Sequence, residues 1–476
     1  MVKTGNTGEE GAPGTLDVVV IGGGPSGVMA AVAAARRGAK VLLVEQYGCL
    51  GGALTVMGVH PMMSFHNKAG RQLIGGLAQE LVDRLVARGA SPGHIPDSIT
   101  YNSTVTPFDS EMLKIVLDEM AAEAGVDVLF HALLAGVEKA GDRLAAVTVA
   151  TRRGLTRVEG RAFIDATGDA DLAALAGVPC VLGRGDGVCQ PMTMNFKLAN
   201  VDMAGVRAFA HAHPEEFWFR DGPEAGLAEL DRTPRASLGG YRLTWQAAKA
   251  AGEVDVPRED ILFFETATPG VVVVNTTRVQ GLDPTDPAAL SRAEMIGRKQ
   301  VHQVYAFLRA RCAGFGSALL MDTPTQIGVR EGRHPQGVHV LTAEELVDEV
   351  RFPDPVAQAG YPVDIHAPKT GMASCNRFLR SAGAYQIPMR CLLVAEPRNL
   401  ILAGRAISAT HEAAAAIRVT PIAMAIGQAA GTLASFAAHD CDATTVPYGP
   451  VRDSLEKQGA LLPSGNGQGD GYADEK

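Results

Sequence analysis

The chain has 476 residues, of which 46% are hydrophobic, and it carries a formal net charge of −9 at pH 7. This length is too great for one compact core and predicts two domains, or one domain that is interrupted by another. The negative charge, without any cluster of Lys and Arg, argues against a nucleic-acid partner. Seven scattered cysteines without metal-ligand spacing predict no metal site and favour a reduced protein of the cytoplasm.

Two uncharged stretches, 18–35 and 419–438, are long enough to be mistaken for membrane spans. The first contains three consecutive glycines and a proline, and the second consists mostly of Ala, Gly, Thr and Ser. We therefore expect both stretches to pack inside the protein, with no membrane partner. Residues 1–16 predict a flexible N-terminus without a secretory leader, and residues 464–476 predict a disordered tail.

The first predicted element is a strand at Val18–Ile21, an apolar run of β-branched residues. Such a run fits a strand that is buried on both faces of a parallel sheet. Gly22, Gly24 and Gly27 follow it with G-x-G-x-x-G spacing. In that spacing the first glycine makes the turn, the second lets a pyrophosphate approach the backbone, and the third packs helix against strand.

A helix from Met29 to Arg36 would then point its amino end, with its unpaired N–H groups, at the phosphates. A second strand follows at Val41–Val44, and Glu45 at its end is placed to accept a hydrogen bond from a ribose hydroxyl. An acidic residue there disfavours a phosphorylated ribose. Strand, glycine turn, helix and acid together predict an adenine-dinucleotide site.

The next elements continue this domain. Residues 108–124 predict a helix with Asp109 or Ser110 as its cap, because apolar residues recur at helical spacing. A strand is expected at 126–131. Strands at 137–150 and 155–159 are then expected to form an antiparallel pair, which the polar turn 151–154 connects.

A second informative segment is RAFIDATGD, from Arg161 to Asp169. It predicts a short buried strand that ends in a turn of small residues, followed by an Ala-rich helix from Asp171 to Ala176. The turn would lie beside the nucleotide phosphates, where a bulky residue would intrude.

Between about residues 196 and 375 the composition changes, and both tryptophans lie there. We expect this region to be the substrate domain. Within it, 261–266 and 271–278 should pair as a hairpin and 290–312 should form a long helix. Catalysis would occur where this domain meets the reactive end of the cofactor.

The last segment begins with a buried strand at 399–403, which Gly404 and Arg405 terminate at the ligand-facing edge of the sheet. Thr420 and Pro421 are predicted as N-cap and first residue of a long helix that continues to Ser435. Its positive amino end would stabilise an electron-rich ring that becomes anionic on reduction, as a flavin does.

Several motifs together carry a family resemblance. They are EQYGCLGG (45–52), FIDATGDADLAALAG (163–177), ILFFETATPG (261–270), QIGVREGR (326–333), YPVDIH (361–366) and ISATHEAAAAIRVTPIAMAIGQAAG (407–431). With the glycine turn, they make the chain resemble the FAD-dependent oxidoreductases among the glutathione-reductase-like flavoproteins, akin to fumarate reductase flavoproteins. The resemblance implies non-covalently bound FAD and a flavin redox reaction.

It also implies an α/β fold in two parts. A Rossmann-like FAD-binding domain, a parallel sheet with helices, would consist of 17–195 and 376–445. An α+β substrate domain at 196–375 would interrupt it, and a strand at 325–333 would reach the flavin.

Carried over position by position, the resemblance implies contacts with each part of the cofactor. Pyrophosphate contacts are expected at Gly22, Gly24, Pro25, Ser26 and Gly27, ribose contacts at Glu45 with Gln46 beside it, and a flavin-phosphate contact near Gly51 and Gly52. Ala166, Thr167 and Gly168 would add a nucleotide contact, and Gly404, Arg405, Thr420, Pro421 and Ile422 would surround the flavin. The chain departs from the family pattern at Gly332-Arg333-His334, where a serine and paired arginines are expected.

Five side chains are candidates for catalysis at the junction of the domains: His366, His411, Glu412, Arg330 and Arg418. His411 or His366 would accept or donate a proton, because a histidine titrates near neutral pH. Arg418 or Arg330 would clamp a substrate carboxylate through two hydrogen bonds. Structural alternatives stay open, since His411-Glu412 could be a helix cap or a domain-locking ion pair and Arg330 with Glu331 a buried ion pair.

Three residues near the flavin-contacting loop are less favoured candidates for a role at the flavin. His60 or His66 could approach the ring, with a covalent histidyl link as an alternative, and Cys49 is expected to be packed.

The predicted reaction is hydride transfer, either dehydrogenation or reduction, on a small organic substrate. A flavin monooxygenase is the first alternative, although aromatic hydroxylases carry Gly-Asp where this chain has Gly404-Arg405. A flavin-holding scaffold or electron-relay subunit is the second, although a relay would need cysteines spaced for iron–sulfur clusters. A homodimer is compatible with the sequence.

Overall fold

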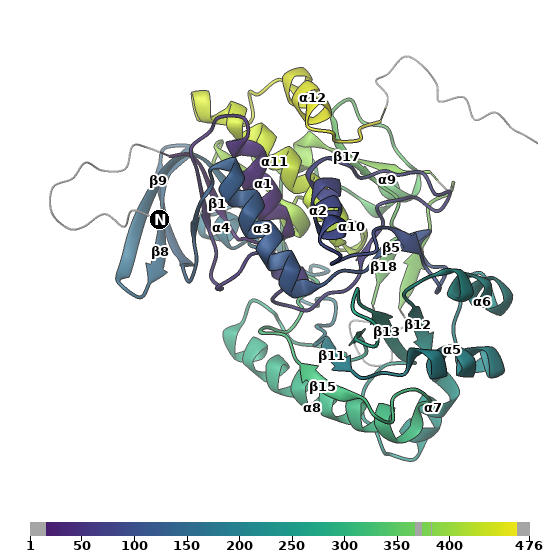
Figure 1. Cartoon of the computed structure of the whole chain (residues 1–476). Helices are drawn as coiled ribbons and strands as arrows, with labels where there is room; N and C mark the ends of the chain where they lie inside the picture. Colours follow the sequence, from purple (N-terminus) through teal and green to yellow (C-terminus); the bar gives the residue numbers. More distant parts are fainter. Residues whose placement is uncertain (1–15, 367–373, 382, 464–476) are drawn as a thin grey trace, which may run out of the picture.

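The computed structural model describes residues 16–366, 374–381 and 383–463. The expected flexible N-terminus, apart from Leu16, and the expected tail at 464–476 lie outside these residues. The chain forms a large α/β part, which carries the first strand, and a smaller α+β part below it (Figure 1).

The large part is built around a parallel sheet. Strand β1 (Leu16–Ile21) pairs in parallel with β2 (Val41–Val44) and with β9 (Gly154–Asp165). Strand β6 (Asp127–Leu129) adds to β2, and β21 (Leu400–Leu402) adds to β9, both in parallel. The β-branched run of β1 is buried as predicted. Because the strands are parallel, their carboxyl ends meet at one edge of the sheet.

The amino-terminal half of β9 belongs to an antiparallel extension of the sheet. It pairs with β8 (Arg143–Thr151), which pairs with β7 (Leu133–Ala140). The predicted turn at 151–154 is confirmed, since Thr151 pairs with Gly154. The prediction of one strand over 137–150 is wrong, because the chain reverses at Gly141, whose φ of +64° suits a glycine turn.

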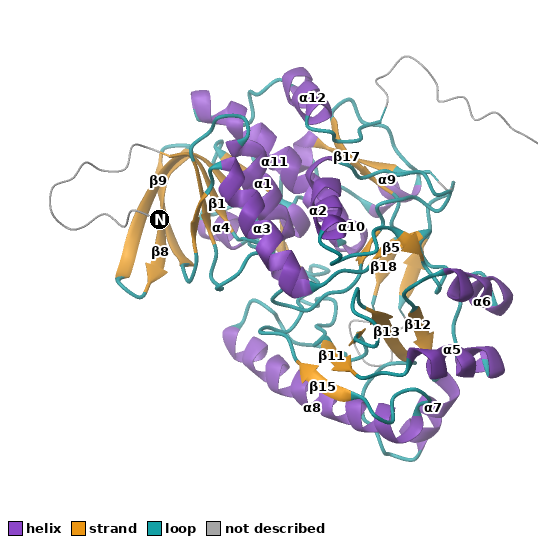
Figure 2. Cartoon of the chain, in the orientation of Figure 1, coloured by secondary structure: helices purple, strands orange, loops and turns teal. Residues whose placement is uncertain are grey.

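Four helices cover the sheet: three of them contact its strands, and α2 packs against these three helices (Figure 2). They are α1 (Pro25–Ala35), α2 (Gly76–Ala87), α3 (Ser110–Ala124) and α11 (Thr420–Asp440). The Asp109 cap of α3 is confirmed, because its side chain accepts from the N–H groups of Glu111 and Met112. Among the described helices, α11 is long and apolar enough to cross a membrane, but 89% of its apolar window is buried inside the protein.

Helices α1 and α11 approach each other closely. A Cβ atom on Gly427 would lie 2.1 Å from the carbonyl oxygen of Ser26, and one on Gly431 would lie 1.9 Å from that of Ala30. Only glycine permits this approach, because any side chain would overlap the backbone of α1.

Short elements complete the large part. They are the helices α4 (Asp171–Leu175), α9 (Ala343–Val347), α10 (His411–Ile417) and α12 (Tyr448–Lys457), with the strands β3 (Met62–Met63), β4 (Ile95–Pro96), β5 (Thr104–Thr106), β17 (Pro355–Ala359), β18 (Val363–Ile365), β19 (Cys375–Arg377) and β20 (Tyr385–Pro388). A further pair, β10 (Cys180–Leu182) with β16 (Arg333–Pro335), follows the connection between the two parts.

The smaller part, which we call the cap, contains an antiparallel sheet. Its strand order is β12 (Ser237–Gly240), β13 (Ile261–Glu265), β14 (Val272–Val274), β11 (Phe196–Ala199) and β15 (Leu319–Asp322). Its helices are α5 (Met203–Ala212), α6 (Pro223–Arg232), α7 (Arg242–Ala250) and α8 (Pro287–Arg311). The predicted hairpin of β13 with β14 and the predicted long helix, α8, are confirmed.

Two hydrophobic cores underlie the two parts. One core joins buried residues of 18–178 with those of 341–455, and the other joins buried residues of 192–329. The expected cap boundary at 375 differs from this packing, because 341–363 belongs to the first core and β17 pairs with β20. The expected strand at 325–333 is also absent from the described strands. Gly328 forms one bridge with Thr193, and β16 begins only at Arg333.

Candidate functional site

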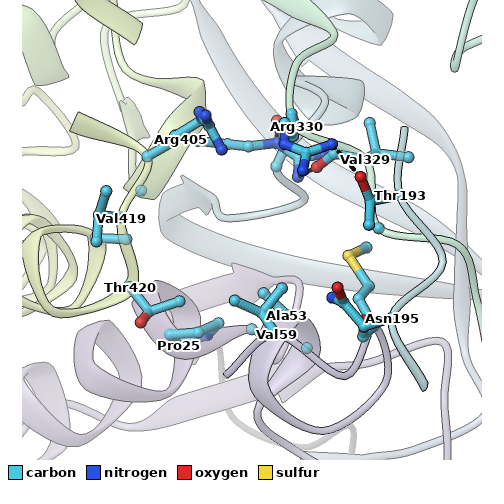
Figure 3. Close-up of a pocket in the computed structure, with 18 of the residues that line it drawn as sticks. Pro25, Ala53, Val59, Thr193, Asn195, Val329, Arg330, Arg405, Val419 and Thr420 are labelled. Atoms are coloured by element: carbon cyan, nitrogen blue, oxygen red, sulfur yellow. Dashed lines mark hydrogen bonds between the residues drawn. The ribbon is translucent and has the colours of Figure 1, made fainter. Parts of the chain in front are cut away.

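A pocket of about 910 Å³ runs from the carboxyl edge of the parallel sheet to the cap (Figure 3). At one end its wall contains the last residues of β1 and β2, the residues that follow β9 and β21, and the first residues of α1 and α11. At the other end the wall contains residues of the cap and of 361–366. The pocket therefore joins the predicted dinucleotide site to the predicted substrate domain.

The glycine turn shapes the first end of the pocket. Gly22 has a φ of +102°, and a Cβ atom there would lie 2.4 Å from the carbonyl oxygen of Ala166. A Cβ atom on Gly27 would lie 1.8 Å from the carbonyl oxygen of Gly22, whereas one on Gly24 would meet nothing within 4 Å. The backbone thus agrees with the separate roles that were predicted for the three glycines. Gly22 and Gly27 close the turn, and Gly24 leaves open space where a phosphate can approach.

The amino end of α1 offers hydrogen-bond donors to this space. Gly24 is the N-cap of α1 and supplies no capping side chain. The first N–H groups of the helix are therefore available for an anion. The hydroxyl of Ser26 is buried and has no hydrogen-bond partner in the described chain, so it is a further donor for a ligand.

Glu45 and Gln46 line the pocket next to the turn. The carboxylate of Glu45 accepts from the N–H of Gly23 at 2.6 Å and from the N–H of Tyr47 at 2.8 Å. Burial raises the pKa of Glu45 above its ordinary value. Each carboxylate oxygen can accept more than one hydrogen bond. Glu45 therefore has room to accept from a ribose hydroxyl as well, and that contact stays a prediction.

The amino end of α11 faces the same pocket. The helix begins at Thr420 after Val419, which is extended and offers no capping side chain. The prediction of Thr420 as the N-cap is therefore wrong by one residue. Val419, Thr420 and Ala423 line the pocket, whereas Pro421 and Ile422 are buried on other faces of the helix and do not contribute to the lining.

The turn after β9 also lines the pocket. Ala166, Thr167 and Gly168 line it as predicted for a nucleotide contact. Asp165 accepts from the N–H and the hydroxyl of Thr167 and from the N–H of Ala173, and burial raises its pKa to about 6.

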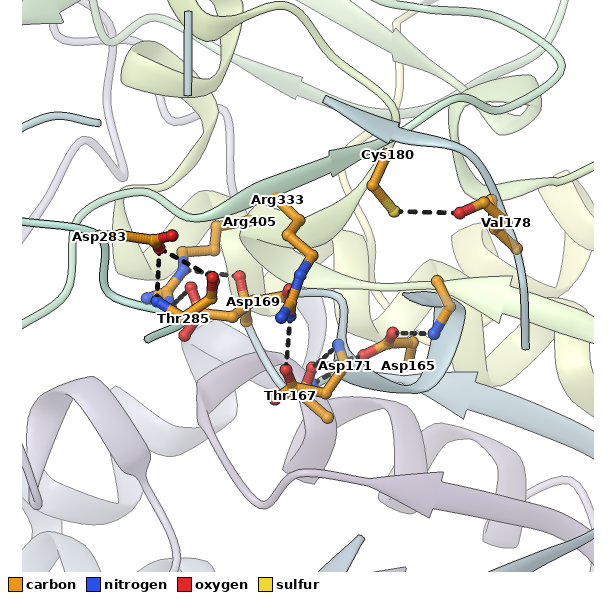
Figure 4. A network of polar contacts seen from close by, with 12 residues as sticks. Asp165, Thr167, Asp169, Asp171, Val178, Cys180, Asp283, Thr285, Arg333 and Arg405 are labelled. Atoms are coloured by element: carbon orange, nitrogen blue, oxygen red, sulfur yellow. Dashed lines mark hydrogen bonds and ion pairs between the residues drawn. The ribbon is translucent and has the colours of Figure 1, made fainter. Parts of the chain in front are cut away.

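Arg405 ties this turn to the cap connection (Figure 4). Its Nε donates to the carbonyl of Gly168 at 2.7 Å, its Nη1 donates to the carbonyl of Val329 at 2.6 Å, and its Nη2 pairs with Asp169 at 2.8 Å. Gly404 and Arg405 both line the pocket. The side chain of Arg405 thus holds three segments together beside the expected flavin position.

Gly52 lines the pocket, whereas Gly27 and Gly51 are absent from its wall. Gly51 has a φ of +105°, which a turn requires and which favours glycine.

The departure from the family pattern at Gly332-Arg333-His334 is partly explained by the contacts of these residues. Arg333 lines the pocket and pairs with Asp171 at 2.8 Å, and His334 instead contacts Glu331.

Three of the five catalytic candidates, Arg330, Arg418 and His366, meet in the wall of the pocket. Arg330 donates from Nη1 to the carbonyl of Pro191 at 2.7 Å and to the hydroxyl of Thr193. This contact with Thr193 is drawn in Figure 3. The suggested ion pair of Arg330 with Glu331 is therefore wrong.

Charge is concentrated around these three residues. Arg418 lies 4.0 Å from the carboxylate of Asp364, and its buried Nε has no partner among the described residues. The Nε2 of His366 lies 3.4 Å from the same carboxylate. Burial, with repulsion from four arginines, holds the pKa of His366 well below its ordinary value. Those arginines are Arg330, Arg418, Arg258 and Arg278.

The other two catalytic candidates, His411 and Glu412, lie at the start of α10 and do not contribute to the described pocket wall. The Nδ1 of His411 is 2.6 Å from Glu331, and the Nε2 of His334 is 2.8 Å from the same oxygen. These hydrogen bonds lower the pKa of Glu331 to about 2 against the effect of burial. The contact joins α10 to the cap connection, which agrees with the domain-locking alternative.

Sequence reasoning missed several side chains of the cap end. Tyr101, Trp218, Asn195, Asn275 and Arg258 line the pocket, and all except Trp218 carry a buried polar atom without a partner in the described ranges. One signal was present. Alternate residues of the strand ILFFE face opposite sides of a sheet, so Leu262 and Phe264 had to face something other than the cap core.

His60 also lines the pocket, and burial lowers its pKa to about 3. Its Nε2 has no hydrogen-bond partner among the residues described. In the described parts of the chain, no group of three or more His, Cys, Asp or Glu side chains could hold a metal ion.

Comparison with known proteins then decides the family. Residues 17–455 match the family described as FAD dependent oxidoreductase. The chain belongs to the FAD-dependent oxidoreductases. It is an oxidoreductase with FAD as its cofactor, and its mixed α/β fold is the Rossmann-like fold that was predicted.

Curated relatives of this flavoenzyme match only segments of it. The chain is 34% identical over 135 residues to the thiamine thiazole synthase of Aeropyrum pernix, which is 28% of this chain and 43% of that protein. It is 33% identical over 109 residues to the bilirubin reductase of Mediterraneibacter gnavus, 21% of this chain and 17% of that protein. The chain thus spans less than half the length of these relatives.

Solved structures resemble the flavoenzyme over more of its length. A geranylgeranyl bacteriochlorophyll reductase-like protein of Thermoplasma acidophilum is 15% identical with a TM-score of 0.47, covering 94% of this chain and 84% of that one. A flavin-dependent brominase is 12% identical, also with a TM-score of 0.47 and the same coverage.

The residues of the pocket fit FAD. The open space over Gly24 with the uncapped end of α1 suits the pyrophosphate. The uncapped end of α11 contributes Val419 and Thr420 to the same pocket, and the flavin ring is expected there. Its positive end favours the reduced, anionic ring.

Proposed function

We propose that this oxidoreductase transfers a hydride between its FAD and a small organic carboxylate. The observation that carries the proposal is the meeting of Arg330, Arg418 and His366 in one wall of the pocket. When bound, FAD supplies the hydride chemistry itself, and the protein contributes orientation and electrostatics.

Arg330 and Arg418 would bind the carboxylate. Burial, with repulsion from Arg418, holds the pKa of Arg330 well below its ordinary value, so an anion bound beside the two arginines would favour their charged forms. The unpartnered Nε of Arg418 offers one donor of the planar fork that matches a carboxylate. The two arginines thus support recognition of an anion.

His366 would move the proton. Its lowered pKa keeps the ring neutral at pH 7, so it can accept a proton from the substrate when the hydride leaves. Asp364, 3.4 Å away, would orient the ring and stabilise the imidazolium that forms. In the reductive direction the ring would first take up a proton from solvent, and the imidazolium would then donate it to the substrate.

The test is single-turnover kinetics of the FAD-loaded protein without oxygen, followed by flavin absorbance. The first probes are 2-hydroxybutanoate for flavin reduction and 2-butenoate for flavin reoxidation. We expect His366→Gln to slow the chemical step by about 100-fold or more, since general acid–base catalysis contributes about 10²–10⁴-fold. Arg418→Gln should weaken binding by about 10- to 100-fold.

His211→Ala and Arg232→Gln are matched controls, because both side chains are exposed and contact carboxylates on the surface of the cap. Both controls should keep wild-type kinetics. Wild-type rates and affinities in both pocket variants would contradict the proposal. A hydroxylated product that forms only with oxygen would favour the monooxygenase alternative instead.

A further inference from the structure

We infer that the substrate carboxylate is attached to a planar aromatic body, which lies against Tyr101 and Trp218 in the cap end of the pocket. This inference rests on the proposed function, because it takes the carboxylate to lie at Arg330 and Arg418. It adds the chemical class of the part of the substrate that does not react.

Three aromatic side chains form one continuous wall of the pocket. The ring centroids of Tyr101 and Trp218 are 6.3 Å apart, and those of Tyr101 and Tyr361 are 5.8 Å apart. These spacings are within the range in which aromatic rings attract each other. A further ring in the pocket could join this series with an edge or a face.

The aromatic wall leads directly to the proposed carboxylate site. The hydroxyl of Tyr361 donates to Asp364 at 3.1 Å. The carboxylate of Asp364 is 3.4 Å from His366 and 4.0 Å from Arg418. An aromatic ring beside Tyr101 and a carboxylate beside Arg418 can therefore belong to one small molecule.

The cap sheet supplies two apolar side chains and a recess, next to charged residues of 258–260 that also line the pocket. Leu262 and Phe264 point to the pocket face of β13, whereas Phe263 between them belongs to the cap core. Gly239 of β12 pairs with Leu262 and also lines the pocket. A Cβ atom on Gly239 would meet only Asp260, at 3.2 Å, so the sheet surface is open there and can accept a flat group.

The two tryptophans of the chain differ in burial, and this difference distinguishes the aromatic wall from ordinary core packing. Trp245 is fully buried in the cap core, as expected for a structural indole. Trp218 is 42% exposed although it lines the pocket. The hydroxyl of Tyr101 is buried without a hydrogen-bond partner in the described chain. Both side chains gain contacts if a ring with a polar edge binds against them.

The experiment is a titration of the FAD-loaded protein with 3-phenylpropanoate, butanoate and 3-phenylpropan-1-ol, followed by tryptophan emission and flavin absorbance. We expect 3-phenylpropanoate to bind at least about tenfold more tightly than butanoate, because the ring leaves water for an aromatic wall. Trp218→Ala should remove about tenfold of this affinity and change the affinity for butanoate by less than about twofold.

Two further variants serve as controls for this titration. Trp218→Phe retains an aromatic ring but leaves buried Trp245 as the one remaining indole, so binding should persist while the change in emission disappears. Leu243→Ala changes an apolar side chain of α7 that is 49% exposed and is not among the residues of the pocket wall, and it should bind as the wild type does.

Equal affinities for butanoate and 3-phenylpropanoate would overturn the inference, and so would an unchanged preference in a Trp218→Ala, Tyr101→Ala double variant. Failure of the proposed function gives a different result. The alcohol would then bind as tightly as 3-phenylpropanoate, and Trp218→Ala would weaken both, which supports the aromatic wall without a carboxylate site.

Discussion

The two ends of the pocket are built in different ways. The cofactor end is shaped by close backbone contacts at glycines, as between Gly27 and Gly22 and between Gly427 and Ser26. At the substrate end the wall is mostly side chains, such as Trp218, which distant segments contribute. The first end is therefore sensitive to the addition of a single methyl group. The second can change its chemistry while the fold persists.

The comparison predicts that the largest loss of stability comes from the backbone-built end. In Gly431→Ala, the new Cβ atom would lie 1.9 Å from the carbonyl oxygen of Ala30, so α1 and α11 must move apart. We expect the free energy of unfolding of the FAD-loaded protein to fall by about 3 kcal/mol, at the upper end of what overpacking costs. Urea titration measures this, with retention of FAD as a second readout.

Gly449→Ala in α12 is the matched control. A Cβ atom there meets nothing within 4 Å, so the change should be neutral or stabilise by up to about 1 kcal/mol, because Ala favours a helix. Equal changes in the free energy of unfolding for the two substitutions would contradict a close contact between α1 and α11.

A smaller effect is expected where α10 meets the cap connection, through the contacts of Glu331 with His334 and His411. The shift of the Glu331 pKa from 4.5 to about 2 sets an upper limit of about 3 kcal/mol on its stabilisation. We expect Glu331→Gln to cost about 2 kcal/mol at pH 7, since glutamine retains part of the hydrogen bonding. Urea titrations measure the difference.

The pH dependence of that difference has a definite sign. Because the folded pKa is depressed, the stabilisation is complete above about pH 4.5 and is lost as the pH falls toward 2. The variant should therefore approach the wild type between pH 7 and pH 3.5. Glu344→Gln, at an exposed pair with Arg377, should stay within about 0.5 kcal/mol of the wild type. A difference for Glu331→Gln that grows on acidification would contradict this account.

The smallest predicted effect is at His366 of the substrate end. A histidine with the ordinary pKa of 6.5 would lose about fourfold of its neutral form between pH 8 and pH 6. The pKa of His366 lies well below that value, so the neutral ring persists over this range. We expect the rate of flavin reduction to change by less than about twofold from pH 8 to pH 6. A fourfold loss of rate with a midpoint near pH 6.5 would show that the proton is transferred by a group with an ordinary histidine pKa, which contradicts the role given to His366.

Much of the cofactor end could be predicted from the sequence. The strand at 16–21, the turn at Gly22 and the helix that follows depend on rules that act over a few residues, namely buried strand patterning, positive φ and an uncapped helix end. The errors there were local, such as the one-residue shift at Thr420 and the missed reversal at Gly141.

The substrate end shows where such rules stop. Arg330, Arg418 and His366 were named in advance, but so was His411, which Glu331 holds away from the pocket wall. Nothing in the few residues around each candidate distinguishes these cases. The difference depends on which distant segment packs against it.

The sequence by itself therefore determined the dinucleotide fold, because steric limits on glycine turns and buried strands leave a signature within one short segment. The cofactor class followed from the family resemblance of motifs that are spread along the chain. Only the tertiary structure decided that Trp218 and Tyr101 share a wall with Arg418. Their separation along the chain is more than 100 residues in each case. Packing of the cap sheet against the parallel-sheet part, which no local pattern encodes, brings them together.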